Sequence, residues 1–414
     1  MKKGAAWLAM MLLLNAVFAF STITLAEEGK VHLEFLQSKA ESAEAYEKLI
    51  EKFEAENPDI DVEQISLSDT LSVLVTRLAS GQGPDLFNHF PLRADFSEIV
   101  NSNQIIPITG EDFLKNINPS AVEMVTRDDG NVYSLPLTMN SMGVYYNLEI
   151  MEKYGLSIPN TYEELIAMLE SVKDKEDGKF LFACKDAWTL WQMMDRRLGQ
   201  LFINSDADFA TTFQAIADGS MHAADSPEIV KAAEKCLQLY QYAQDDPFGT
   251  SFAQMCDDFA NGKGIAFFQG TWAYPNIKAT NPELKFVMTA FPADEGQVSY
   301  LSMNIDIGIS ISKDCKHVEE AKRFMAFMAE TENAQLFNDI DGSMSLVNGV
   351  VTDIPEFKTV YEDIDNGLVY EMMSNLWPNG YTTALMDYVS SMLLYNDIDT
   401  YLSDVDQLTV EMYK

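Results

Sequence analysis

The chain has 414 residues, 47% of them hydrophobic, and a formal net charge of −36. That length exceeds what one ordinary hydrophobic core fills, so we expect two domains. The acidic excess argues against nucleic acid and against anionic membrane surfaces as partners, because both require basic patches. The four cysteines (Cys184, Cys236, Cys256 and Cys315) form no C-x-x-C pair and no zinc-like spacing, and one disulfide with unassigned partners is left open.

The first 26 residues are typical of a signal peptide. Two lysines precede an apolar run from residue 7 to 20, and cleavage is expected after Ala26, with Ala19 as the weaker option. No other stretch approaches the roughly 20 apolar residues of a spanning helix, so we expect a soluble mature chain. No cysteine stands immediately after the cleavage site, and the first in the chain is Cys184, so export to the periplasm or the cell surface is expected without a lipobox anchor.

The mature chain opens with alternating strand and helix patterns. Residues 31–36, 60–65 and 85–87 predict strands, and apolar residues at helical spacing predict helices over 42–57 and 71–78. This alternation predicts a parallel sheet covered by helices on both faces.

A second alternating region begins near Gly143. Thr161 and Glu164 have the spacing of a capping box, and Ser226-Pro227 is typical of a helix start. Apolar residues at helical spacing follow over 318–328 and 385–392. No flexible linker separates the two regions, so we expect strands that cross between the domains and domains built from discontinuous segments.

Four stretches of the chain carry short motifs, which follow one another in a fixed order. They are Leu78–Phe87 with its glycine turn and Pro-Asp strand, Tyr133–Leu165, Phe259–Trp272 with its Gly-Lys turn and terminal Gly-x-Trp, and Gly308–Glu332 with a strand and a following helix. Together they resemble the extracellular solute-binding protein family of ABC importers, in its carbohydrate, maltose-binding-protein-like branch. The resemblance spans nearly the whole mature chain.

The resemblance implies an α/β fold of two lobes, the periplasmic-binding-protein fold, joined by crossing hinge strands with the ligand in the cleft between them. It places residues 27–139 and 291–329 in lobe 1, and residues 140–290 and 330–414 in lobe 2. It implies an extracytoplasmic substrate-binding protein that captures a carbohydrate by hinge closure and delivers it to the transmembrane permease subunits of an ABC importer. We expect a monomer that uses no cofactor and no metal.

A sugar site needs flat aromatic rings for the C–H faces of the sugar and polar groups for its hydroxyls. Trp272 follows a glycine at a strand end, where the resemblance implies a stacked sugar ring; the alternative is a core anchor. Trp188 and Trp191 lie at a helix start, and we favour Trp188 because it is nearer the preceding loop. Trp377 lies in a turn-rich stretch and either contacts the ligand or packs against a lobe.

The polar candidates lie at strand ends, where the alternative for each is a helix cap or a solvated loop residue. They are Ser38, Asn88, His89, Arg93, Asn140, Asn304 and Asp306. In the maltose-binding branch the position of His89 is aromatic and that of Asn140 is a glutamate. This departure argues against a simple malto-oligosaccharide site.

An enzyme is the main competing interpretation. A glycoside hydrolase needs two carboxylates about 5–10 Å apart, and 64 acidic residues single out no pair. The chain has no G-x-S-x-G elbow, no phosphate loop and no H-E-x-x-H, so we expect no catalytic residue. Within the binding class, a polyamine or another small solute is the alternative ligand, and a sensor or a surface adhesin is the alternative role.

Overall fold

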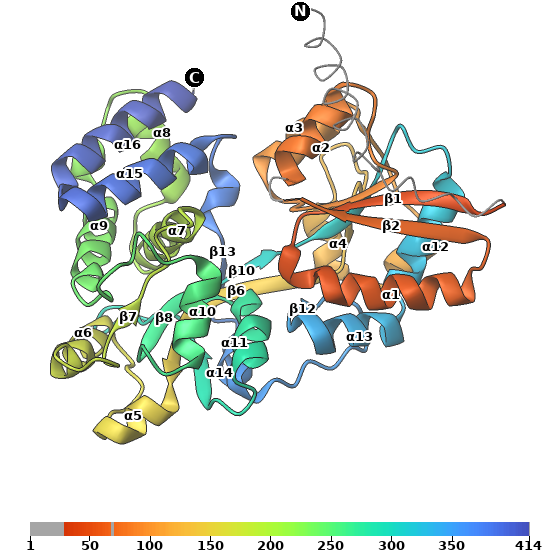
Figure 1. Cartoon of the computed structure of the whole chain (residues 1–414). Coiled ribbons are helices and arrows are strands. Elements are labelled where there is room, and N and C mark those ends of the chain that lie inside the picture. The colour runs from red at the N-terminus through yellow and green to blue at the C-terminus, as the bar shows by residue number, and fades with distance from the viewer. Residues whose placement is uncertain (1–28, 68–69, 414) are drawn as a thin grey trace, which may run out of the picture.

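The computed structural model describes residues 29–67 and 70–413, and the expected signal peptide lies outside them. These residues form two lobes, each built around its own β-sheet (Figure 1). Among the described helices, none has both the length and the apolar character that crossing a membrane requires.

The first lobe contains a mixed sheet in the order β2-β1-β3-β11-β4, with β5 paired to β11. Its strands are β1 (Val31–Gln37), β2 (Ile60–Ser66), β3 (Leu86–His89), β4 (Ile105–Ile106), β5 (Leu135–Pro136) and β11 (Gly308–Ser312). The pairing of β1 with β2 and β3 is parallel, as predicted. β11 runs antiparallel to β3, β4 and β5. The parallel sheet expected from the alternation is therefore wrong for the part of the sheet that contains β11.

Helices cover both faces of the first sheet, as predicted. They are α1 (Ala43–Glu56), α2 (Thr70–Ala79), α3 (Ala94–Asn101), α4 (Pro119–Val125), α12 (Val318–Met328) and α13 (Thr331–Asp341). Side chains alternate along β1, so Leu33 and Phe35 pack with α1 and α12, whereas Leu36 packs with α2 and α3.

The second lobe contains a sheet in the order β13-β10-β6-β8-β7, with β9 and β12 also paired to β6. Its strands are β6 (Thr138–Asn147), β7 (Phe180–Leu181), β8 (Ala266–Gly270), β9 (Phe286–Thr289), β10 (Leu301–Ile305), β12 (Met344–Ser345) and β13 (Val369–Glu371). β6 runs antiparallel to β8, β9, β10 and β12. It is therefore the central strand of this lobe.

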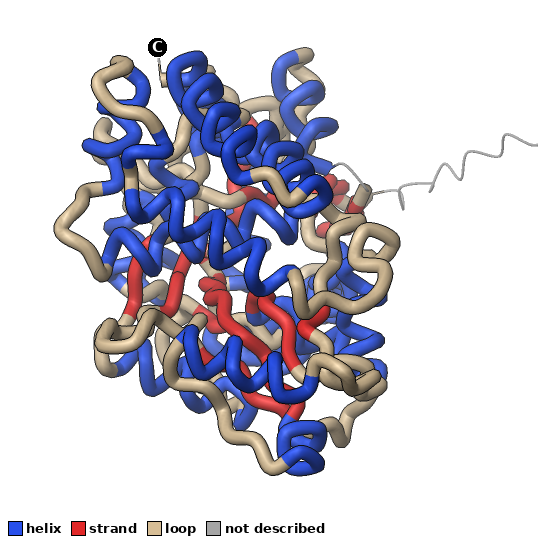
Figure 2. Tube along the Cα trace, turned by 90° about the vertical axis from the view of Figure 1, so that its left-hand side faces the viewer, coloured by secondary structure: helices blue, strands red, loops and turns tan. Residues whose placement is uncertain are grey.

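Two groups of helices cover the second sheet (Figure 2). On the face of Val144 and Tyr146 lie α5 (Leu148–Tyr154), α6 (Tyr162–Val172), α7 (Trp188–Ile203), α8 (Phe209–Ala217), α9 (Pro227–Tyr240), α15 (Tyr381–Tyr395) and α16 (Ile398–Met412). On the face of Tyr145 lie α10 (Phe252–Ala260), α11 (Tyr274–Thr280) and α14 (Lys358–Asp365).

The predicted caps begin the expected helices. The Thr161 hydroxyl accepts a hydrogen bond from the Glu164 amide at the start of α6 (3.2 Å), and the Glu164 carboxylate accepts one from the Asn160 amide (2.7 Å). The Ser226 hydroxyl accepts a bond from the Ile229 amide at the start of α9. These side chains satisfy amides that the first helical turn leaves without partners.

The chain crosses between the sheets where β5 leads into β6 and where β10 leads into β11. β10 pairs with β6 and β13 in the second lobe, and β11 pairs with β3 in the first. The link between β10 and β11 consists of Asp306 and Ile307 alone. This short link places Asp306 at the junction of the two lobes.

The lobe boundaries implied by the resemblance stay predictions, and the packing of the cores bears on two of them. Phe291 packs in a core of the second sheet, although residues 291–329 were assigned to lobe 1. Phe337 packs in the core of the first sheet, although residues 330–414 were assigned to lobe 2. We therefore propose that one boundary lies near residue 306 and that the other follows α13, within residues 342–347.

The cysteines belong to these cores. All four are buried and none is bonded to another. Cys184 and Cys236 lie in a core of the second lobe, and Cys315 lies in the core of the first. The described cores are therefore closed by packing, without the disulfide that the sequence left open.

His89 ends β3 inside the first lobe. Its ring is 0% exposed and lies 5.4 Å from the ring of Phe96, centroid to centroid. Its Nδ1 accepts a hydrogen bond from the Phe90 amide (2.8 Å). Burial lowers the pKa of His89 to about 4, so this side chain is neutral in the folded protein at neutral pH.

We expect His89 to make the fold less stable in acid. Its pKa is about 4 in the folded protein and about 6.5 in an unfolded chain, so the unfolded chain takes up the proton first as the pH falls. The stabilising contribution is full above pH 6.5 and decreases toward pH 4, by roughly 3 kcal/mol in total. Urea unfolding of the His89→Gln variant should show a shallower loss of unfolding free energy over this range. Equal slopes for variant and wild type would contradict this assignment.

Candidate functional site

A cavity of about 510 Å³ lies between the two lobes. We call it the cleft. The first lobe contributes residues that follow β1 and β3 and the start of α2, and the crossing region contributes Asn140, Asn304 and Asp306. The second lobe contributes α7, Trp272, and the turn from Met372 into α15. The cleft therefore has walls from both lobes and a floor at the crossing strands.

The second lobe forms an aromatic wall. Trp188, Trp191 and Trp272 line the cleft, and the rings of Trp188 and Trp272 lie 6.4 Å apart at 52°. A Cβ at Gly270 would lie 2.1 Å from the Trp272 ring, so only glycine lets this ring lie over the strand end. The sequence favoured Trp188 over Trp191, and the cleft is lined by both.

Trp377 lines the cleft but belongs mostly to the core. Its side chain is 3% exposed and stacks on Tyr381 at 5.0 Å and 27°. Phe209 and Phe213 lie within 6.1 and 6.3 Å of its ring. Packing against the lobe, the alternative left open by the sequence, therefore accounts for most of this ring.

A buried ion pair forms the floor of the cleft. The Lys39 ammonium donates to Asp306 Oδ2 (2.5 Å), and Asn140 Nδ2 donates to Asp306 Oδ1 (2.8 Å). Burial alone would lower the pKa of Lys39, but the charges of Asp306, Asp341 and Glu41 outweigh burial and raise it. Lys39 is therefore a permanent cation, held where β10 passes into β11.

The other lining cations are also paired. Arg93 Nη2 donates to Asp95 Oδ2 (2.7 Å) on the first lobe, and Arg196 Nη1 donates to Asp195 Oδ2 (2.5 Å) on α7. Burial raises the pKa of Glu41, whose carboxylate lies 3.9 Å from the Lys39 ammonium. In the described part of the chain, each cation that lines the cleft thus has a carboxylate partner.

Two predicted residues lie behind the wall of the cleft. Asn88 Oδ1 accepts hydrogen bonds from the Ser38 amide and hydroxyl, both 2.8 Å long. Asn88 thus holds Ser38, which lines the cleft, without lining it. His89 is buried in the first lobe and also lies outside the lining. Both belong to β3, whose four residues are all buried. The prediction that these two residues contact the ligand because they lie at a strand end is therefore not supported by their positions.

The remaining predicted residues line the cleft together. They are Ser38, Arg93, Asn140, Trp188, Trp272, Asn304, Asp306 and Trp377. Asn304 Oδ1 also accepts a hydrogen bond from Asn375 Nδ2 (3.1 Å).

Two further residues of α7, Gln192 and Arg196, line the cleft and were not predicted from the sequence. A signal was present, because they follow Trp188 by four and eight residues and so lie on the same face of the helix.

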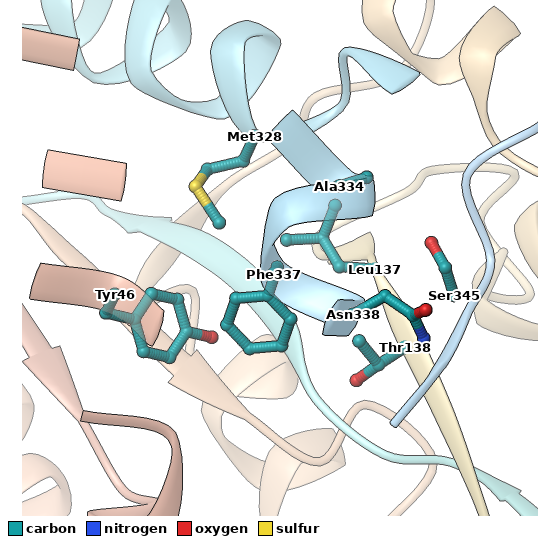
Figure 3. Close-up of a pocket in the computed structure, with 8 residues that line it drawn as sticks. All are labelled: Tyr46, Leu137, Thr138, Met328, Ala334, Phe337, Asn338 and Ser345. Carbon is teal, nitrogen blue, oxygen red and sulfur yellow. The ribbon is translucent and has the colours of Figure 1, made fainter. Parts of the chain in front are cut away.

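Two other cavities are poor candidates for a sugar site. The first, between α1, α13 and the start of β6, is lined mainly by apolar side chains such as Tyr46 and Phe337 (Figure 3). Its volume of about 10 Å³ holds one water molecule at most. The second is a larger surface groove of about 690 Å³ in the second lobe, lined by paired charges such as Lys153 with Asp177 and by a single aromatic residue, Tyr154.

The sequence matches known proteins over most of its length. Residues 38–335 match the sequence model of the family described as bacterial extracellular solute-binding protein. The chain is 31% identical over 339 residues to a multiple sugar-binding protein of Streptococcus mutans, covering 79% of this chain and 78% of that protein. It is 23% identical over 343 residues to the melibiose/raffinose/stachyose-binding protein MelE of Bacillus subtilis, covering 81% and 79%.

The fold also matches solved structures. The substrate-binding protein RafE in complex with raffinose superimposes with a TM-score of 0.84 at 23% identity, covering 93% of this chain and 100% of that one. A sugar transporter protein of Bacillus licheniformis in complex with stachyose superimposes with a TM-score of 0.77 at 22% identity, covering 92% and 100%. These similarities show a common two-lobed fold. Because the family match extends over well over half of the chain, this protein belongs to the bacterial extracellular solute-binding protein family.

Proposed function

We propose that this protein is the exported substrate-binding component of an ABC importer and that it captures a short carbohydrate in the cleft. The lining of the cleft is the observation that carries this proposal. Three tryptophans on the second lobe offer flat apolar surfaces, and hydrogen-bonding groups at the floor and on the first lobe lie around the same cavity. This combination suits a sugar, which has apolar C–H faces and a belt of hydroxyls.

The pairing of charges favours an uncharged ligand. Lys39, Arg93 and Arg196 each have a carboxylate partner, so the lining offers donors and acceptors without an unbalanced charge. A polyamine would need unpaired carboxylates, and of the three carboxylates that the described residues contribute to the lining, Asp95 and Asp306 are paired directly. The relatives whose names mention melibiose, raffinose and stachyose bind uncharged oligosaccharides, which agrees with this choice.

The mode of action follows from the position of the cleft between the lobes. A ligand that contacts both lobes favours the closed arrangement by its difference in affinity for the two states. The crossings at β5–β6 and β10–β11 are the segments that bend. We propose that the protein acts as a monomer, that it delivers its ligand to the transmembrane permease subunits, and that it performs no catalysis.

Replacing Trp272 should abolish tight sugar binding. In a thermal-shift screen we expect raffinose or stachyose to raise the melting temperature of the wild type. All four described tryptophans line the cleft, so binding should also change the tryptophan fluorescence. Trp272→Ala should weaken binding by about tenfold or more, because it removes the stacking surface.

The control for this variant is Tyr395→Ala. The Tyr395 ring is 74% exposed at the end of α15 and outside the cleft lining, so its removal should leave sugar binding unchanged. A melting shift with spermidine but with no sugar would refute the carbohydrate assignment. Consumption of the sugar during the assay would show an enzyme.

An acidic sugar should bind more weakly than a neutral one of the same length. Trigalacturonic acid carries carboxylates for which the cleft has no unpaired cation, so we expect its affinity to be at least about tenfold below that of raffinose. Asp95→Asn leaves Arg93 without its carboxylate partner. The difference in affinity between raffinose and trigalacturonic acid should therefore become smaller, as measured by isothermal titration calorimetry. Tighter binding of the acidic sugar by the wild type would contradict the neutral assignment.

A further inference from the structure

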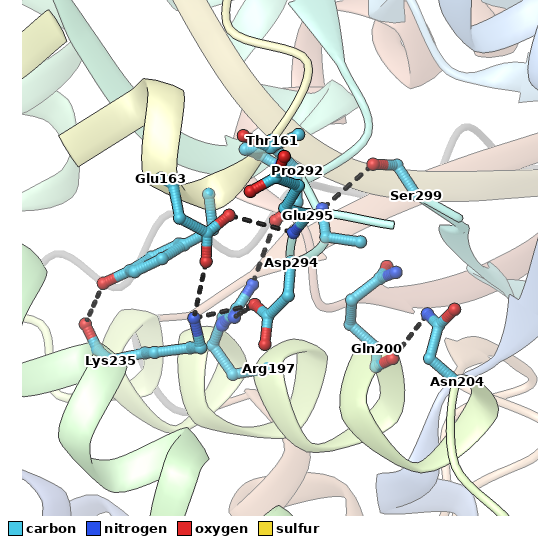
Figure 4. A network of polar contacts seen from close by, with 12 residues as sticks. Thr161, Glu163, Arg197, Gln200, Asn204, Lys235, Pro292, Asp294, Glu295 and Ser299 are labelled. Carbon is cyan, nitrogen blue, oxygen red and sulfur yellow. Dashed lines mark hydrogen bonds and ion pairs between the residues drawn. The ribbon is translucent and has the colours of Figure 1, made fainter. Parts of the chain in front are cut away.

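The C-terminal half of α7 is bonded to the segment that leads into β10 (Figure 4). Arg197 Nη1 donates to the Pro292 carbonyl (3.3 Å), and Gln200 Nε2 donates to the Val298 carbonyl (2.6 Å). Asn204 bonds the same residue twice, donating to the Val298 carbonyl and accepting from its amide (2.9 and 3.1 Å). Two turns of α7 and the residue that caps its C-terminus are thus attached to the segment before β10.

Arg197 adds cation–aromatic contacts to this attachment. Its guanidinium is buried and lies 4.9 and 4.4 Å from the ring centroids of Tyr162 and Phe291. Lys235 lies over the Tyr162 ring at 3.7 Å and pairs with Asp294 at 2.7 Å (Figure 4). Such desolvated cation–aromatic contacts stabilise one defined arrangement of the elements that carry them.

Arg196 connects this anchored helix to the cleft. Its side chain lines the cleft, yet its Nε donates to the Ser302 hydroxyl on β10 (3.2 Å) and its Nη1 donates to Asp195. Its backbone carbonyl accepts a hydrogen bond from the Tyr370 hydroxyl on β13 (3.0 Å). The residue therefore touches the ligand cavity and the crossing strand at the same time.

Ser302 lies on the cleft side of β10. Side chains alternate along a strand, so residues 302 and 304 share a face, and Asn304 lines the cleft together with Asp306, which follows β10 at the junction of the lobes. The bond from Arg196 to Ser302 therefore attaches α7 to the strand that continues into the other lobe.

The Asp195–Arg196 pair is buried, which costs desolvation free energy. Burial is the largest influence on Asp195 and raises its pKa, while Arg196 and Ser374 oppose that rise. Ser374 itself lines the cleft. The pair thus connects α7 to the turn that carries Ser374 and to β10.

We propose that Arg196, through its bond to Ser302, is a positioning residue that couples the aromatic wall on α7 to the crossing strand β10, and so links ligand contact to lobe closure. This inference rests on the proposed function, since it concerns binding in the same cleft. Trp188 and Trp191 belong to α7, so in this proposal their position in the cleft depends on the contact between α7 and β10.

The test removes the Ser302 hydroxyl and leaves every lining side chain in place. Ser302→Ala should weaken raffinose binding about fivefold, the loss expected for one hydrogen bond. It should also reduce the decrease in radius of gyration that raffinose causes in small-angle X-ray scattering. Arg196→Lys keeps a charge for Asp195 but loses the fixed fork of donors, so it should change both quantities in the same direction.

Ser141→Ala is the matched control. Ser141 is a buried serine on the neighbouring strand β6, 1% exposed where Ser302 is 2% exposed. It pairs with Met303, so it faces the opposite side of the sheet from Ser302. We expect it to leave affinity and compaction as in the wild type, because the Ser141 hydroxyl has no hydrogen-bond partner among the described residues.

The outcomes separate this inference from the proposed function. Wild-type affinity and compaction in Ser302→Ala would overturn the coupling, and so would equal losses in Ser302→Ala and Ser141→Ala. If neither raffinose nor any other sugar of the thermal-shift screen binds the wild type, the carbohydrate assignment fails. The Ser302→Ala and Ser141→Ala variants are then compared with spermidine, or with another solute that raises the melting temperature of the wild type. Equal affinity and compaction in the two variants would again overturn the coupling.

Discussion

The ion pair between Lys39 and Asp306 is the contact on which the arrangement of the two lobes around the cleft depends. Lys39 comes from the loop after β1 in the first lobe, and Asp306 is in the two-residue link from β10 to β11. Asn140 at the start of β6 completes the contact from the second crossing. A buried charge is costly unless it is paired and hydrogen-bonded, so these three residues constrain one another.

The two lobes contribute different chemistry to the same cavity. The second lobe supplies rings, because α7 and the end of β8 both expose tryptophan at its wall. The first lobe supplies short polar loops at the ends of β1 and β3, supported from behind by Asn88. Under the proposed function, a ligand enclosed in the cleft contacts both kinds of surface, and these contacts favour the closed arrangement.

Much of the first lobe could be predicted because its signals are local. The helix over 43–56 and the strands on either side of it follow from apolar spacing within a few residues. The position of β11, antiparallel to β3, could not be predicted in this way, because β3 is more than 200 residues away in the chain. The packing of α13 in the first lobe also depends on partners far away in the chain, because Phe337 lies against Tyr46 of α1.

The sequence by itself determined which residues could recognise a sugar: Trp272 after its glycine, the tryptophans of α7, and polar residues at strand ends. These signals are short motifs. They predict which residues lie near the cleft, but they do not predict how the side chains are arranged in it. Only the tertiary structure decided that His89 and Asn88 are buried behind the wall, because a side chain's direction at a strand end depends on the neighbouring strands. Only the fold brings Arg196 to Ser302, 106 residues away, and Lys39 to Asp306, 267 residues away. Long-range pairs of this kind arise from the packing of whole elements, which no local pattern in the chain encodes.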